Sequence, residues 1–240
     1  ASRPFPHEII CGVELDDELL RVYAFRKNGR QLFITRPKTG VKRELLDMAQ
    51  KNAQEYLDKA ISAIAHRNDM TVNACERLQT LLSLSRYPKR MECYDISNIS
   101  GVDKVGSMVV FTDGEPDKVQ YRRFRIKTVE GANDFASLKE VLTRRLGKLG
   151  TQEEERFPRP DLIVIDGGKG QLSSVKEVFD ELGVTGIDLV SLAKREEEVF
   201  TCFQDESIKI NHRDYALKLL QRLRDEAHRF AITYFRNLHS

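Results

Sequence analysis

Residues 161–171, Asp-Leu-Ile-Val-Ile-Asp-Gly-Gly-Lys-Gly-Gln, are the stretch around which this chain is organised. The four branched apolar residues at 162–165, followed by an acid and two glycines, predict a central strand that is buried on both faces. Asp166 would stand where this strand ends, and a carboxylate there needs a metal, a cation or hydrogen-bond donors. The glycines and Lys169 favour close approach of a ligand. An ordinary strand-to-helix turn capped by an aspartate would give the same pattern.

A second stretch of the same kind lies earlier in the chain. Residues 91–101, Met-Glu-Cys-Tyr-Asp-Ile-Ser-Asn-Ile-Ser-Gly, form another short strand pattern, which contains Asp95. Two carboxylates side by side in one sheet repel each other unless a divalent cation lies between them. Asp95 and Asp166 therefore predict a site for Mg²⁺ or Mn²⁺, because these ions suit hard oxygen ligands, whereas zinc prefers nitrogen and sulfur.

The order of the expected elements is that of the ribonuclease-H-like fold. Three strands joined by short turns predict an antiparallel meander, after which helices and strands alternate. In that order the first and fourth strands lie adjacent and parallel, which places Asp95 beside Asp166. The fold class is thus an α/β mixed sheet of three antiparallel strands plus parallel strands, with flanking helices. Strands are expected at 91–96, 105–111, 120–127, 161–166 and 188–192, and helices at 134–149, 171–182 and 215–237.

The first 88 residues predict an N-terminal α+β extension. Helices are expected where apolar residues recur at helical spacing, and a domain boundary where Tyr87-Pro88 breaks that pattern. The ribonuclease-H-like domain would then cover residues 89–240. In the extension, strands are expected at 8–15, 19–25 and 31–35, a turn at 27–30, and helices at 42–67 and 70–84.

Composition and charge exclude several classes of protein. The chain has 39 Lys and Arg residues against 37 Asp and Glu residues, so any contact with nucleic acid must be local. No apolar run is long enough to span a membrane, and no secretory signal opens the chain. Gly170 follows Lys169 where a nucleotide-binding P-loop needs Ser or Thr, so no nucleotide cofactor is expected. The four cysteines form no Cys-x-x-Cys pair and predict buried side chains in a reducing cytoplasm: Cys11, Cys75, Cys93 and Cys202.

Two groups of basic side chains could contact a phosphate backbone. One face of the strand expected at 120–127 carries Tyr121, Arg123, Arg125 and Lys127. The end of the following helix carries Arg144, Arg145 and Lys148. Each group also has a purely structural explanation: charges on an edge strand hinder aggregation, and cations at the end of a helix complement its dipole.

His228 lies at the border of the buried stripe of the last helix, about 100° round from Ala227. With Asp225 three residues earlier, it could be a packed side chain with its hydrogen bonds satisfied. Alternatively, its imidazole reaches Asp95 and Asp166 as a metal ligand or a proton-transfer group. The three residues together would suit metal-dependent hydrolysis of a phosphodiester.

Several blocks of sequence resemble the C-terminal half of UvrC, the nuclease of bacterial nucleotide excision repair. The blocks are 94–98 (Tyr-Asp-Ile-Ser-Asn) with Gly101, 121–124 (Tyr-Arg-Arg-Phe), 165–172 (Ile-Asp-Gly-Gly-Lys-Gly-Gln-Leu), 192–195 (Leu-Ala-Lys-Arg) with 197–200 (Glu-Glu-Val-Phe), and 224–231 (Arg-Asp-Glu-Ala-His-Arg-Phe-Ala). The resemblance implies a metal-dependent endonuclease that cuts the damaged DNA strand on the 5′ side of a lesion. The family's catalytic triad and metal ligands map onto Asp95, Asp166 and His228.

The same resemblance implies partners and a setting. The expected partners are damaged double-stranded DNA and the UvrB–DNA pre-incision complex. The expected setting is the cytoplasm, during the DNA-damage and SOS responses. The expected DNA contacts are Lys169, Arg123, Lys194 and Arg195, with Arg144 and Arg145. The family's Gly-Ile-Tyr nuclease blocks, UvrB-docking segment and helix-hairpin-helix module do not occur in these 240 residues, so a fragment is expected.

Two other functions stay open. One is a catalytically weak scaffold that binds nucleic acid, although clustered carboxylates beside a phosphate backbone have no use in such a protein. The other is a ribonuclease, which shares the fold and the metal. An Asp95→Ala variant that binds DNA without cutting it would separate an enzyme from a scaffold, and a preference for RNA would indicate a ribonuclease.

Overall fold

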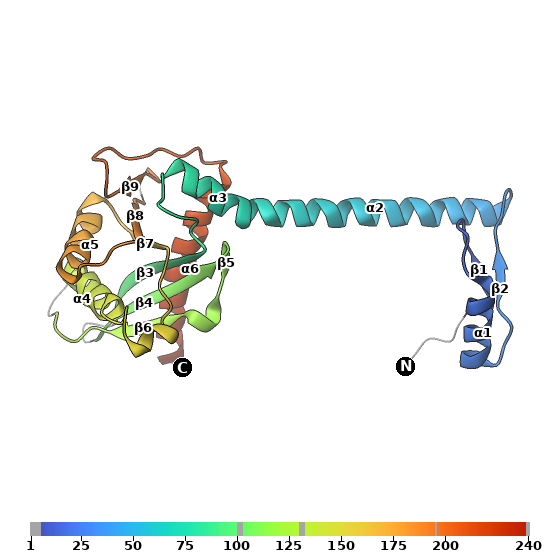
Figure 1. The fold of residues 1–240 in the computed structure, drawn as a ribbon, viewed down its shortest axis with the longest axis horizontal. Coiled ribbons are helices and arrows are strands. Elements are labelled where there is room, and N and C mark those ends of the chain that lie inside the picture. The colour runs from blue at the N-terminus through green and yellow to red at the C-terminus, as the bar shows by residue number, and fades with distance from the viewer. Residues whose placement is uncertain (1–5, 100–102, 130–132, 195, 239–240) are drawn as a thin grey trace. The chain divides into compact units, whose positions relative to one another are not determined.

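The computed structural model describes residues 6–99, 103–129, 133–194 and 196–238 (Figure 1). Its backbone forms two compact units, Ala1–Ala65 and His66–Ser240. Arg195, one of the expected DNA contacts, lies outside the described residues. Among the residues that are described, no helix combines the length and the apolarity needed to cross a bilayer.

The smaller unit begins with a β–α–β arrangement. Strand β1 (Glu8–Ile10) pairs in parallel with β2 (Phe33–Thr35), and helix α1 (Asp17–Asn28) connects them. Helix α2 (Val41–Met70) follows, close to the range expected for it. The first strand is shorter than the pattern at 8–15 predicts.

The strand predicted at 19–25 is wrong, because these residues lie in α1. The Asp16 side chain accepts a hydrogen bond from the Leu19 N–H at 2.9 Å, and Gly29 ends the helix in a left-handed conformation with φ of 64°. Acidic residues occupy the first turn and basic residues the last turn, as the helix dipole favours. Apolar and aromatic side chains suggested a strand here, but these helix caps outweigh that preference.

The larger unit is built on a mixed seven-stranded sheet. Its strands lie in the order β5-β4-β3-β7-β8-β9, and β6 also pairs with β4. Strands β3, β7 and β8 are parallel, whereas β4 is antiparallel to β3 and β6. The predicted fold class and the parallel pairing of the first and fourth strands are confirmed. The strands are β3 (Arg90–Ile99), β4 (Asp103–Thr112), β5 (Glu115–Pro116), β6 (Arg122–Arg125), β7 (Leu162–Asp166), β8 (Asp188–Leu192) and β9 (Val199–Thr201).

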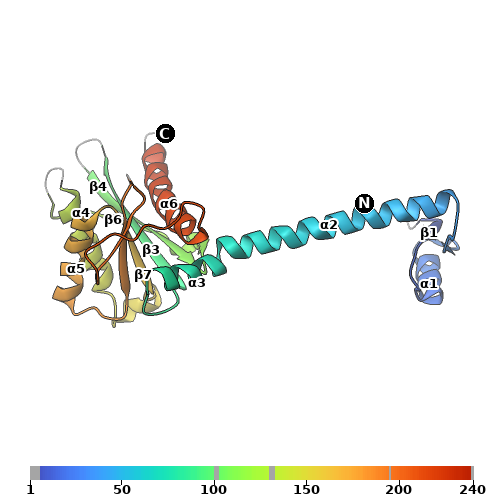
Figure 2. The ribbon, with the colours of Figure 1, turned by 90° about the horizontal axis from the view of Figure 1, so that it is seen from above.

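Helices cover both faces of this sheet (Figure 2). Helices α4 (Asp134–Leu146) and α5 (Lys169–Leu182) pack on one face, and α6 (Tyr215–Leu238) packs on the other. Helix α3 (Val72–Leu81) packs against α6. Residues 162–165 of β7 are fully buried between these layers, as the apolar run predicts.

Three details of the larger unit differ from expectation. The third strand is shorter than 120–127, since residues Lys118–Gln120 form a 3₁₀ turn. Strand β9 is not among the strands expected from the sequence. Cys202 is exposed, whereas the other three cysteines are buried as predicted, and all four are free thiols.

Candidate active site

The sheet brings Asp95 and Asp166 to neighbouring positions. Tyr94 in β3 pairs with Ile165 in β7, and each aspartate is the next residue along its strand. Because the two strands are parallel, both carboxylates stand at the same end of the sheet. Beyond Asp166 the chain turns at Gly167, whose N–H donates to the carbonyl oxygen of Leu192 at 3.0 Å, before α5 begins.

Asp166 has one carboxylate oxygen with a partner and one without. The Lys194 ammonium lies 3.0 Å from Asp166 Oδ2. Asp166 Oδ1 is buried and has no hydrogen-bond partner among the described residues, and the side chain is only 7% exposed. Burying an unsatisfied carboxylate oxygen is costly, so this atom is suited to receive a cation.

Asp95 lies in an environment that disfavours its charge. Burial raises the pKa of Asp95 above its ordinary value, and the nearby Asp166 carboxylate raises it further, whereas His228 and Lys194 lower it. The Nδ1 atom of His228 lies 3.8 Å from Asp95 Oδ1. Two carboxylates therefore lie close together at one end of the sheet, and a bound cation would reduce the repulsion between them.

His228 takes the border position that the helical spacing predicts. Its neighbour Ala227 is fully buried against the sheet, whereas the His228 side chain is 61% exposed. The imidazole therefore approaches Asp95 from the rim of the site and remains open to a ligand or to solvent.

A cavity of about 280 Å³ lies between these side chains. Its lining consists of Asp166, Lys194, Glu197, Arg224, Asp225 and His228. With Asp95 included, four carboxylates face two cations, which leaves a net charge of −2 when His228 is neutral. A hard divalent cation would balance that charge.

The described residues bring two oxygen donors together but no complete set of ligands for any metal. In the described part of the chain, no three His, Cys, Asp or Glu side chains are gathered closely enough to hold a metal. The neighbouring carboxylates of Asp95 and Asp166 are the donors that fit, and the unpartnered Asp166 Oδ1 is the atom best placed to bind.

The basic residues predicted to contact DNA are distributed unevenly around this site. Lys194 lines the cavity. Arg123 on β6 is exposed and lies in the same register row as Asp95, because Ser107 of β4 pairs with both residues. Its guanidinium carbon lies 3.9 Å from the centre of the Phe230 ring on α6.

Lys169 and Arg144 have partners away from the aspartate pair. The Lys169 ammonium lies 2.8 Å from Asp205 Oδ1, on the exposed surface at the start of α5. The Arg144 guanidinium donates to the carbonyl oxygen of Arg125 at 2.6 Å. Both side chains remain partly exposed.

The prediction that Arg145 contacts DNA is wrong. Its side chain is fully buried, and its Nη2 lies 2.8 Å from Glu92 Oε1 in the core between β3 and α4. Tyr94 donates to the other oxygen of Glu92 at 2.6 Å. Helical spacing places Arg145 on the same face of α4 as Leu138 and Val141, and the buried acid on β3 holds its charge there.

Two further residues of the site were not singled out from the sequence. Glu197 and Arg224 line the cavity and form an ion pair, with 3.1 Å between Oε1 and Nη1. Both residues stand in blocks that resemble the UvrC family. Their pairing could not be predicted, because it forms only where the loop that carries Glu197 contacts the helix that carries Arg224.

Family models and curated relatives match most of the chain. The model described as "UvrC RNAse H endonuclease domain" matches residues 79–232, and the one described as "UvrC Ribonuclease H-like domain" matches residues 1–60. UvrABC system protein C of Dehalococcoides mccartyi is 46% identical over 98% of this chain, and that of Moorella thermoacetica is 42% identical over 96%. The chain spans 39% and 38% of the length of these two relatives.

Solved structures give a distant likeness. The crystal structure of human ENDOV matches with a TM-score of 0.42 at 12% identity, covering 69% of this chain and 97% of that one. Family membership rests instead on the family models and the curated relatives. They show that this chain belongs to the UvrC ribonuclease-H-like endonuclease domain family.

Proposed function

We propose that this chain is a divalent-metal-dependent DNA endonuclease of nucleotide excision repair, which hydrolyses a phosphodiester on the 5′ side of a lesion in the damaged strand. The observation that carries the proposal is the neighbouring carboxylate pair, Asp95 and Asp166, with the buried Asp166 Oδ1 that lacks a partner among the described residues. Membership of the UvrC domain family supports the same class of reaction.

Each residue of the site has a role in this proposal. Asp95 and Asp166 would hold Mg²⁺ or Mn²⁺ through their carboxylate oxygens. When bound, such an ion would polarise the phosphoryl group and activate a water molecule. His228, with Nδ1 at 3.8 Å from Asp95 Oδ1, would complete the site as a ligand or a proton carrier. Lys194 on the cavity lining would contact the scissile phosphate or its neighbour.

The substrate and partners belong to the same proposal. Damaged double-stranded DNA would approach the sheet edge that carries the aspartates, with Arg123, Lys169 and Arg144 as contacts to its phosphates. Arg195 stays a prediction for this role. In the cytoplasm the chain would act on the UvrB–DNA pre-incision complex.

The first experiment is nicking of a supercoiled plasmid with Mn²⁺ as the metal. The parent chain is expected to nick the plasmid, and Asp166→Ala and His228→Ala are each expected to lose at least 100-fold in rate. His212→Ala is the matched control, because His212 is an exposed histidine outside the cavity lining. Equal rates in the parent and in Asp166→Ala would contradict the proposal.

A second experiment tests the side of incision. A duplex with one lesion, labelled at either end of the damaged strand and loaded with UvrB, should be cut on the 5′ side only. Cleavage of RNA in preference to DNA would instead make the protein a ribonuclease. Binding of DNA without cleavage by the parent, in the presence of bound Mn²⁺ and UvrB, would favour a scaffold.

A further inference from the structure

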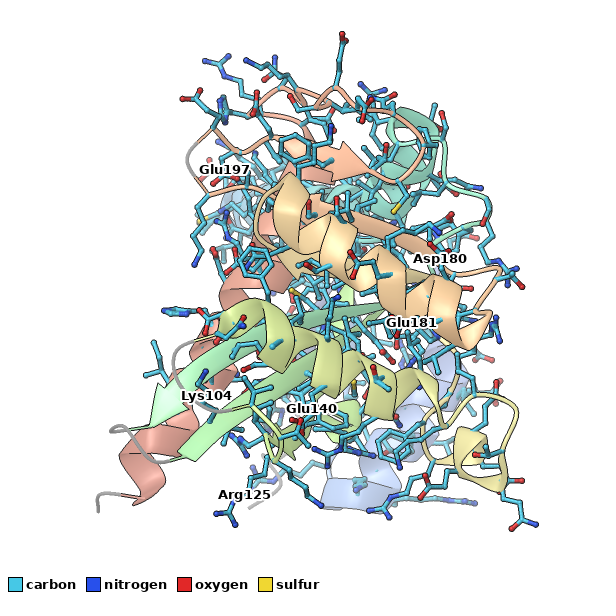
Figure 3. All side chains as sticks on the ribbon, turned by 90° about the vertical axis from the view of Figure 1, so that its left-hand side faces the viewer. Lys104, Arg125, Glu140, Asp180, Glu181 and Glu197 are labelled. Atoms are coloured by element: carbon cyan, nitrogen blue, oxygen red, sulfur yellow. The ribbon has the colours of Figure 1, made fainter. Side chains whose placement is uncertain are left out.

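Glu197 has an unusual backbone for a residue with a side chain. Its φ is 55°, and only Ser83 and Asp113 share a positive φ among the described residues other than glycine. Side chains disfavour this region, and such residues persist where their surroundings hold them, often at functional sites. Glu197 belongs to the loop between β8 and β9, and in Figure 3 it lies on the opposite side of the view from Asp180 and Glu181.

The Glu197 carboxylate binds two side chains of α6. Its Oε1 lies 3.1 Å from Arg224 Nη1, and its Oε2 accepts a hydrogen bond from Gln221 Nε2 at 2.8 Å. Gln221, Arg224 and His228 follow one another at spacings of three and four residues, so they lie on one face of the helix. Glu197 is therefore attached to the helix face that carries His228.

The same loop reaches the aspartate side of the cavity. It connects β8 and β9, and its described residues are 193, 194 and 196–198. The Ala193 N–H donates to the carbonyl oxygen of Glu198 at 2.9 Å, which closes the base of the loop. Lys194, within it, forms the ion pair with Asp166. One short loop thus contacts both the sheet side and the helix side of the cavity.

We propose that Glu197 is a positioning residue of the active site. Its carboxylate holds the β8–β9 loop against α6. This contact sets the distance from the Asp166–Lys194 ion pair to the imidazole of His228. Both carboxylate oxygens are engaged by α6, so Glu197 acts through these neighbours and not on the reacting atoms. The inference rests on the proposed function, which it deepens by naming what aligns the two sides of the site.

The test uses the 240-residue chain with Glu197→Gly, Glu197→Gln and the control Ser83→Gly. Both glycine variants relieve a positive φ, but only Glu197→Gly loses the contact with α6. Four properties are measured: amide hydrogen exchange of residues 196–199, the ring NMR signals of His228, the Kd for Mn²⁺, and kcat and KM for plasmid nicking. The His228 signals are identified by their absence in His228→Gln.

Glu197→Gly should speed amide exchange at least tenfold and shift the His228 signals. Its kcat should fall at least tenfold, while KM and the Kd for Mn²⁺ stay within threefold and the thermal midpoint does not fall. Glu197→Gln keeps an acceptor oxygen at the same length, so it should recover much of the kcat. Ser83→Gly should match the parent throughout.

Two results would overturn the inference. One is unchanged amide exchange and unchanged His228 signals in Glu197→Gly. The other is a loss of Mn²⁺ affinity of more than tenfold, which would make Glu197 a metal ligand. If the parent itself neither nicks DNA nor binds Mn²⁺, the proposed function fails, while the exchange and NMR measurements still decide whether Glu197 positions His228.

Discussion

One oxygen atom sets Asp166 apart from the other carboxylates that the structure describes. Its Oδ1 is the single buried carboxylate oxygen without a hydrogen-bond partner in the described residues, and Lys194 neutralises only the other oxygen. Asp95 beside it is partly desolvated and repelled. Unsatisfied buried charge of this kind costs stability and persists where function requires it, so under the proposed function the two residues would trade folding free energy for a cation site.

Asp95→Asn should stabilise the metal-free chain. The amide has no charge to desolvate and does not repel Asp166, so the free energy of unfolding at pH 7 should rise by about 1 kcal/mol and the thermal midpoint by roughly 2–4 °C. Because the folded pKa of Asp95 is raised, the penalty exists only where the carboxyl is ionised. The difference from the parent should therefore narrow as the pH falls towards the ordinary value of 3.8.

Thermal melts with and without Mn²⁺ check this prediction. Mn²⁺ should raise the midpoint of the parent and leave that of Asp95→Asn nearly unchanged. Asp180→Asn is the control, since Asp180 is an exposed carboxylate on α5 and its change should stay within about 0.5 kcal/mol. A lower midpoint in metal-free Asp95→Asn would mean that the native carboxylate stabilises the fold.

Strand β3 presents opposite chemistry on its two faces. Asp95 faces His228 on α6, whereas Glu92 faces α4 and is enclosed by cations and a hydroxyl. Side chains along a strand alternate between faces, so Glu92 and Asp95, which are three residues apart, point to opposite faces of the sheet. The buried Glu92–Arg145 pair ties β3 to α4 and thereby fixes the strand that carries Asp95.

Arg145→Met should destabilise the larger unit without any direct effect on DNA binding. Removing one partner of a buried ion pair leaves Glu92 short of a counter-charge, which costs about 3 kcal/mol. Arg144→Met is the neighbouring control: it removes a partly exposed ion pair with Glu140 at 3.5 Å and the hydrogen bond to the Arg125 carbonyl oxygen, so it should cost only about 1 kcal/mol.

Urea denaturation of the two variants measures this difference. An equal, small effect of both substitutions on the midpoint would show that the Glu92–Arg145 pair contributes little. DNA affinity, measured below the unfolding midpoint at low salt, should be unchanged in Arg145→Met.

The two units of the molecule differ in how much apolar surface they bury. Most of the buried apolar side chains belong to His66–Ser240, where they fill both sides of the seven-stranded sheet. The described residues before Ala65 bury only Cys11, Ala24, Leu32 and Leu46. The larger unit therefore has its own hydrophobic core, which is what an independently folding domain requires.

A truncated chain of residues 66–240 should keep the fold and the thermal midpoint of the larger unit. A chain of residues 89–240, cut at the boundary predicted from Tyr87-Pro88, should unfold at a lower temperature or aggregate. It lacks α3, whose Ala74, Cys75 and Leu78 are fully buried in the core that includes α6.

Thermal melts and size-exclusion chromatography of both chains compare the two boundaries. Equal midpoints would place the domain start at residue 89 and make α3 part of the preceding segment. Mn²⁺-dependent nicking by residues 66–240 at the parent rate would in addition locate the proposed chemistry in the larger unit.

Much of the fold could be predicted because its signals are local. The apolar run at 162–165 marks a strand buried on both faces, and the sequence of strands and helices around it permits few topologies. The error at 19–25 is also local: apolar and aromatic residues favour a strand, but the caps at Asp16 and Gly29 favour a helix and outweigh them. Short edge strands such as β9 escape prediction because pairing, not propensity, forms them.

Sequence patterns alone are enough to locate the strand ends that carry Asp95 and Asp166, the helix that carries His228, and the order that makes the two strands neighbours. Which cations lie beside these residues depends on the folded chain. Folding buries Arg145 against Glu92, sets Lys194 on Asp166, and joins Glu197 to Arg224. The physical reason is range: periodicity and capping act within one element, whereas each ion pair forms between elements that only the folded chain brings together.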